Sequence, residues 1–171
     1  MKFLILVTVL LAPLVSAADI CRTSRDNCEG TRVCCNGIHE GQCCNLGATV
    51  RHIRYTLPAD SRGRSWTGNS CQGEVRTFPN RHAGTSCHRP ANPGGRSGKW
   101  LRGLGSADEE EGDVVVEAHH SCAEPNTLYY EGEDGLEESA ALPGHLSADE
   151  VLEALERGVS VKTLIIQEIR E

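Results

Sequence analysis

The chain has 171 residues, nine cysteines and a formal net charge of −7. This length allows one domain or two small ones, and two Trp, three Tyr and two Phe residues are too few for a large aromatic core. After the first 17 residues no apolar run approaches the roughly 20 residues that a membrane helix needs. We therefore expect no membrane-spanning helix after residue 17, and retention of the first 17 residues as an anchor is the alternative.

Residues 1–17 have the pattern of a secretory signal peptide. Met1-Lys2 supplies the positive start, Phe3 to Val15 is a mainly apolar run, and Ser16-Ala17 offers small residues for cleavage. We therefore expect a secreted, extracellular protein whose mature chain begins in an oxidising compartment.

Eight cysteines follow directly behind this leader. They are Cys21, Cys28, Cys34, Cys35, Cys43, Cys44, Cys71 and Cys87. In an exported chain they predict a framework of disulfides. Each member of the adjacent pairs, 34–35 and 43–44, should bond a different and distant partner, because a bond between neighbours is strained. One bridge, Cys71–Cys87, is predicted to close a loop between two strands.

The ninth cysteine, Cys122, stands apart from this group. An odd cysteine in an exported chain is either a free thiol or a link to a second chain. We therefore predict a monomer or a dimer linked through Cys122.

Charge divides the chain into two parts. Residues 18–105 carry 13 Lys or Arg against 6 Asp or Glu, whereas residues 106–171 carry 3 against 18. The change occurs at the acidic run 106–113, which is typical of a solvated linker. We predict a basic cysteine-rich β domain over 18–105, an acidic linker over 106–113 and an acidic C-terminal segment over 114–171.

The sequence of the basic part is typical of short strands separated by turns. Extended segments are predicted at Val50 to Tyr55, Arg64 to Gly68, Glu74 to Phe78 and Lys99 to Leu104, with glycines and prolines between them. The predicted fold class is α+β: a small disulfide-stapled antiparallel β unit, sandwich or barrel-like, followed by an acidic α/β segment.

In the acidic part, strands are predicted at Val114 to Val116 and at Leu128 to Tyr130. A helix near 148–157 is predicted from Ser147 as N-cap and Glu150 three residues later, a capping box, followed by apolar residues at helical spacing. The apolar, β-branched segment Val161 to Ile169 fits either a strand or a second helix.

A leader, a basic unit with cysteines in the order C-C-CC-CC-C-C, and an acidic tail together resemble the small secreted cysteine-rich proteins of fungi, of the effector-candidate type. The resemblance covers residues 1–105 and carries over no site residue. It implies an extracellular binding protein that acts on a host or cell-wall partner.

The sequence also contains residue types that occur in catalytic and metal sites. The set His52, Glu74, Arg76, His82 and His88 contains the residue types of a small secreted ribonuclease, but its spacing differs from that family's. His119-His120 with Cys122 lacks a fourth metal ligand. We therefore predict no catalytic residue, no cofactor and no metal.

The expected function is non-enzymatic binding. The partner is an unknown protein or an anionic or polysaccharide surface, without specific nucleic-acid recognition, and the acidic tail solubilises or screens the basic unit. Two alternatives stay open: a secreted ribonuclease, and an antimicrobial or toxin domain with an acidic inhibitory tail. The chain contains no dibasic pair for removal of such a tail.

Overall fold

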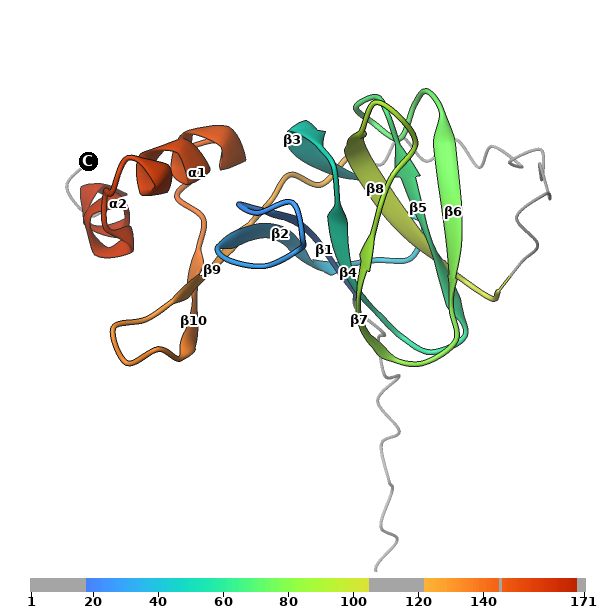
Figure 1. Ribbon diagram of the computed structural model, residues 1–171, viewed down its shortest axis with the longest axis horizontal. Coiled ribbons are helices and arrows are strands. Elements are labelled where there is room, and N and C mark those ends of the chain that lie inside the picture. The colour runs from blue at the N-terminus through green and yellow to red at the C-terminus, as the bar shows by residue number, and fades with distance from the viewer. Residues whose placement is uncertain (1–17, 105–121, 145, 169–171) are drawn as a thin grey trace, which may run out of the picture.

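A computed structural model of the chain describes residues 18–104, 122–144 and 146–168 (Figure 1). The elements in these ranges are β1 (Ala18–Thr23), β2 (Arg32–Ile38), β3 (Cys44–Val50), β4 (Ile53–Leu57), β5 (Ser61–Trp66), β6 (Val75–Asn80), β7 (Gly84–His88), β8 (Gly95–Arg102), β9 (Thr127–Glu131), β10 (Glu137–Ala141), α1 (Ala148–Glu156) and α2 (Val161–Glu168). The leader, residues 106–113 and the predicted strand at 114–116 lie outside the described residues.

Two antiparallel sheets face each other. One has six strands in the order β10-β9-β2-β1-β4-β7, and the other has four in the order β3-β8-β5-β6. Along β4, Ile53, Tyr55 and Leu57 are buried while the residues between them are half-exposed, which is the alternation of a strand with one face on a core. The prediction of an α+β fold built on a stapled antiparallel β unit is confirmed.

Aromatic rings fill the space between the sheets. Trp100 is fully buried and its indole N–H donates to the Ile38 carbonyl at 3.0 Å. Tyr55 donates its hydroxyl to the Arg64 carbonyl at 2.8 Å, and burial raises the pKa of this phenol far above its ordinary value. A third ring, Phe78, packs beside Gly63, where a Cβ would collide with it.

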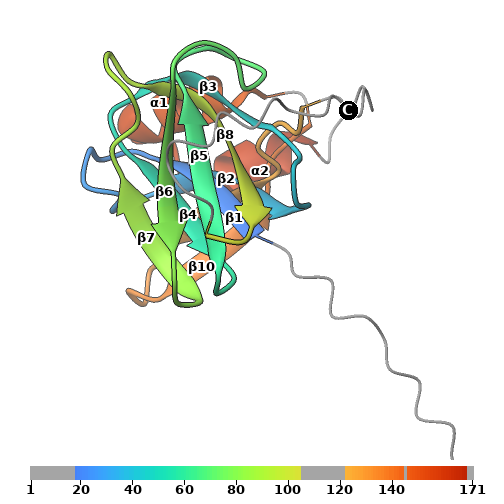
Figure 2. The ribbon, with the colours of Figure 1, turned by 90° about the vertical axis from the view of Figure 1, so that its right-hand side faces the viewer.

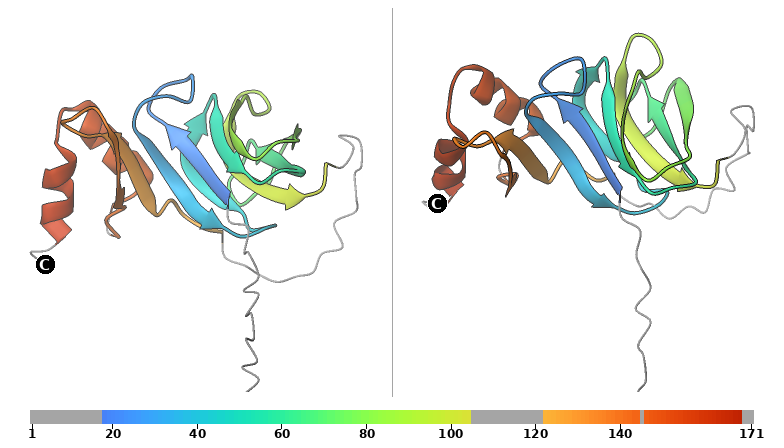
Figure 3. Two further views of the ribbon diagram at one scale, coloured as in Figure 1. Left: turned by 90° about the horizontal axis from the view of Figure 1, so that it is seen from below. Right: turned by 60° about the horizontal axis from the view of Figure 1, so that its bottom comes forward.

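The two helices and the four-stranded sheet cover the same face of the six-stranded sheet, at different places along it. Val33 and Cys35 are two residues apart on β2 and so share one face of the six-stranded sheet. Cys35 packs in the core between the sheets, whereas Val33 packs with Leu128 against the helices. Figure 3 shows the helices and the β9–β10 hairpin at the opposite end of the molecule from β6.

The helix near 148–157 is confirmed as α1, with both hydrogen bonds of the predicted capping box at Ser147 and Glu150. The open question at 161–169 is resolved in favour of helix α2. By contrast, the single extended run predicted from Val50 to Tyr55 is wrong. The chain breaks at residues 51–52, so that β3 joins one sheet and β4 the other.

Four disulfides hold the sandwich together, as expected of a cysteine-rich chain. They join Cys21 to Cys34, Cys28 to Cys87, Cys35 to Cys44 and Cys43 to Cys71. Each adjacent cysteine thus bonds a different partner. The predicted Cys71–Cys87 bridge is wrong, because Cys71 lies beside β8 of the four-stranded sheet, where its N–H donates to Ser97 Oγ. Cys87 lies on β7, at the edge of the other sheet.

The acidic C-terminal segment shares a sheet with the basic part. β9 pairs with β2 through Val33 and Leu128. Beside this ladder the Arg32 guanidinium binds both carboxylate oxygens of Glu137, at 2.5 and 2.8 Å, and lies over the Tyr129 ring. Hydrogen bonding to Arg32 lowers the pKa of Glu137. Carboxylates of the tail are therefore used as structural partners of arginines in the sandwich.

We expect Glu137→Gln to lower the free energy of unfolding by less than about 1 kcal/mol, since the carboxylate is more than half exposed and solvent screens the pair. Because the pKa of Glu137 is lowered in the folded state, this contribution is present above the ordinary carboxyl pKa and is lost as pH falls through the folded value. Urea unfolding between pH 7 and pH 3 measures it. Glu156→Gln, on the exposed side of α1, is the matched control, and equal losses in both variants would contradict the assignment.

Candidate anion-binding site

The structure disperses most of the residues that match a ribonuclease. His52 is half-buried in the connection between β3 and β4, and its Nδ1 is buried without a hydrogen-bond partner. His82 is exposed in the connection between β6 and β7, whereas His88 ends β7 at the end of the strand far from that connection. Glu74 is exposed in the turn before β6 and makes no ion pair among the described residues. Only Arg76 and His88 come close enough to influence each other.

His88 closes the open side of the sandwich. Its ring stacks on Phe78 with 3.6 Å between the centroids, and its Nε2 lies 2.9 Å from Ser86 Oγ. Burial lowers the pKa of His88, and the positive charge of Arg76 lowers it further. Both effects favour the neutral form of the imidazole. Figure 2 shows β6 and β7, which carry this stack, at the same side of the sandwich, where each is the edge strand of its own sheet.

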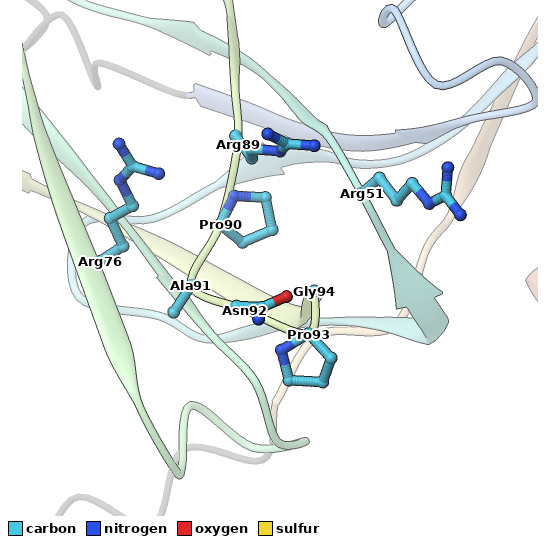
Figure 4. Close-up of a pocket in the computed structure, with 8 residues that line it drawn as sticks. All are labelled: Arg51, Arg76, Arg89, Pro90, Ala91, Asn92, Pro93 and Gly94. Carbon is cyan, nitrogen blue, oxygen red and sulfur yellow. The ribbon is translucent and has the colours of Figure 1, made fainter.

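Next to this stack the surface is hollowed into a cavity of about 540 Å³. Three arginines from separate segments line it: Arg51 from the β3–β4 connection, Arg76 from β6 and Arg89 from the residue after β7. Figure 4 shows Arg89 between the other two, with the loop from Pro90 to Gly94 forming the rest of the wall. This volume is within the range of small-molecule sites.

The charges of this pocket are largely uncompensated. None of its lining residues is acidic. Arg76 and Arg89 make no ion pair with any residue that the structure describes. Arg51 pairs with Asp26 at 3.3 Å, but both side chains are about two-thirds exposed or more, so solvent screens the pair and a ligand can replace it. The lining of the pocket therefore carries a net positive charge.

Guanidinium groups give this pocket a defined chemistry. Each presents a planar fork of N–H donors that matches the oxygens of a carboxylate, sulfate or phosphate group. The Asn92 side chain adds an amide to the lining. Within the lining there is no carboxylate, histidine or nucleophile that would act as a general base. The arrangement suits recognition of anionic groups.

Arg76 belongs to the set of candidate residues predicted from the sequence, whereas Arg51 and Arg89 entered that prediction only through the basic charge of residues 18–105. A local signal for the site exists in the loop Arg89-Pro90-Ala91-Asn92-Pro93-Gly94, where an arginine leads a proline- and glycine-rich turn. Loops of this kind often hold binding residues on a rigid scaffold. Nothing in the linear spacing links this loop to Arg51 or Arg76.

Cys122 has no disulfide partner among the described residues and is half-buried. The ranges of the chain with known placement contain no group of three His, Cys, Asp or Glu side chains arranged to hold a metal ion. The predicted ligands His119 and His120 lie outside those ranges. None of the described helices is long and apolar enough to cross a membrane.

Comparison with known proteins adds one match. The model of a protein family described as the ARB_05566_N N-terminal domain matches residues 19–126, well over half of the chain. No curated protein and no solved structure matches it. The match shows membership of this domain family, and the resemblance to effector-type secreted proteins stays a prediction. The pocket of Arg51, Arg76 and Arg89 lies entirely within the matched residues.

Proposed function

The chain belongs to the ARB_05566_N N-terminal domain family, and from that premise we propose that this domain is a secreted, non-enzymatic binding module for acidic polysaccharides. The observation that carries the proposal is the pocket of Arg51, Arg76 and Arg89, which no lining carboxylate neutralises. The four disulfides fit an extracellular setting, because such bonds persist in oxidising compartments.

A polymer fits the pocket better than a single small anion. The three guanidinium groups come from three segments and line an open, solvent-facing cavity. A repeating chain of carboxylate or sulfate groups places successive charges on successive arginines, and each contact releases counterions. The exposed Pro93 ring offers apolar surface for the face of a sugar ring.

The two alternatives have less support. For a ribonuclease, His82 would have to join Arg76 and His88 at one phosphate, yet it lies in the β6–β7 connection, whereas Arg76 and His88 lie at the far ends of these two strands. For a toxin restrained by its tail, acidic residues should cover the pocket. Among the described residues of the tail, Glu137 and Asp149 instead bind Arg32 and Arg22, which do not line it.

We expect Arg76→Gln/Arg89→Gln to weaken binding to heparin, a model acidic polysaccharide, by at least about tenfold, because a charge-assisted hydrogen bond contributes roughly 1.5–3 kcal/mol. Isothermal titration with the disulfide-bonded protein at several salt concentrations measures this loss. The difference from the unmodified protein should narrow as salt rises, since salt screens exposed charges.

Arg89→Gln and Arg81→Gln form a matched pair, because each removes one exposed arginine and Arg81 lies in the β6–β7 turn away from the pocket. Equal effects of these two changes would mean that overall charge, not the pocket, drives binding. Shortening of the polysaccharide by the protein, or RNA cleavage that is lost in His88→Ala, would replace the binding function with an enzymatic one.

A further inference from the structure

The four-stranded sheet carries a second group of cations on the face turned away from the core. Arg64 of β5 and Lys99 of β8 are direct partners across the two strands. Their chain neighbours Gly63, Ser65 and Trp100 are buried, so Arg64 and Lys99 point outward by the alternation of a strand. Two like charges directly opposite each other in a sheet are destabilising, which calls for a compensating interaction.

The residues that the structure describes do not supply an acidic partner for either side chain. Both cations instead lie over the Trp66 ring, with Arg64 Cζ at 5.2 Å and Lys99 Nζ at 5.3 Å from its centroid. The ring is itself buried, so it fixes the two side chains and keeps their stems packed. The Nε of Arg64 is buried and has no hydrogen-bond acceptor. The other guanidinium N–H groups of Arg64 and the Lys99 ammonium have no acidic partner among the described residues, and they are the donors that an anionic ligand would meet.

We propose that Arg64 and Lys99 form a second anion-binding site, which holds the same acidic polysaccharide chain that the pocket binds. This inference rests on the proposed function for its ligand class. The two sites adjoin at β6, the edge strand of the sheet. Arg76 of the pocket and Thr77 are consecutive residues on opposite faces of β6, and Thr77 pairs with Arg64.

A polysaccharide bound at Arg76 therefore needs only to pass over the edge of β6 to reach Thr77, Arg64 and Lys99 in turn. Positive charge on both sides of one edge strand suits a long, flexible polyanion better than a compact anionic ligand. Linking two weak sites through one ligand strengthens binding without any new contact.

Isothermal titration of the full disulfide-bonded chain with a fully sulfated heparin tetrasaccharide measures the number of binding sites. The unmodified protein is expected to bind two molecules, and Arg64→Gln/Lys99→Gln and Arg76→Gln/Arg89→Gln one each. Arg81→Gln, the control, should keep two. For long heparin, Arg64→Gln/Lys99→Gln should lower affinity by at least about tenfold through the loss of linkage.

The outcomes separate the two proposals. One site in the unmodified protein that is insensitive to Arg64→Gln/Lys99→Gln would overturn the second site and leave the pocket intact. One site that is lost only in Arg64→Gln/Lys99→Gln would overturn the pocket and keep the sheet face. Equal binding of a polyglutamate peptide at that face would overturn the polysaccharide as its ligand. If the double variant does not fold, Lys99→Gln alone, which keeps Arg64 over Trp66, replaces it. This variant is also expected to bind one tetrasaccharide instead of two.

Discussion

Replacing Trp100 with alanine is expected to lower the free energy of unfolding by about 3–5 kcal/mol, the range for deleting a large buried ring. Trp100 has no exposed surface and packs in the core between the two sheets. Its loss also leaves the Ile38 carbonyl without the indole donor at 3.0 Å, and an unpaired buried acceptor adds to the cost of the cavity. Urea unfolding followed by circular dichroism measures the change.

Trp100→Phe separates the two parts of this loss, because it keeps most of the ring volume and removes only the hydrogen bond. We expect about 1–2 kcal/mol for that variant. Leu136→Ala is the exposed control, since Leu136 is 66% accessible, and its effect should stay within about 0.5 kcal/mol. A loss below 1 kcal/mol in Trp100→Ala would place the core elsewhere.

Removal of the Cys28–Cys87 bridge by Cys28→Ala/Cys87→Ala is expected to cost about 4 kcal/mol, because the bridge closes a loop with a sequence separation of 59 residues and restricts the unfolded chain accordingly. It also fixes β7, the last strand of the six-stranded sheet, to the loop between β1 and β2. Chemical unfolding measures the loss, and Cys122→Ala, which breaks no bridge among the described residues, should change little.

Peptide mapping without reduction provides an independent check of the connectivity. Proteolytic fragments that contain Cys28 and Cys87 should remain joined, as should those that contain Cys43 and Cys71. Recovery of a Cys71–Cys87 peptide, or an unfolding free energy unchanged in Cys28→Ala/Cys87→Ala, would show that the strands are held differently.

Local patterns predicted the parts of the fold that depend on neighbours in the chain. The capping box at Ser147 and Glu150 is complete within four residues, and α1 begins where that motif places it. β7 carries no such signal, because its sequence GTSCH has no apolar alternation. It becomes a strand through pairing with β4 and through the bridge at Cys87, which are both long-range interactions.

The same distinction applies to the candidate site. Arg76 and His88 were selected for their residue types, and the structure brings these two together because β6 and β7 meet through the Phe78–His88 stack. Arg51 enters the pocket only because the chain crosses between the two sheets at residues 51–52. A single strand from Val50 to Tyr55, as predicted, would have no such crossing. The sequence-based prediction therefore could not place Arg51 beside Arg76 and Arg89.

The place of β9 beside β2 has a consequence for how the chain is made. β2 is among the first strands to be synthesised, but its partner on one side, β9, is completed only at Glu131. Until then one edge of β2 has no strand to pair with, and Val33 lacks both Leu128 and the helices that cover it. The Cys35–Cys44 bridge joins residues that are made early and nine positions apart, whereas the largest sheet cannot be complete until the acidic end of the chain has been made.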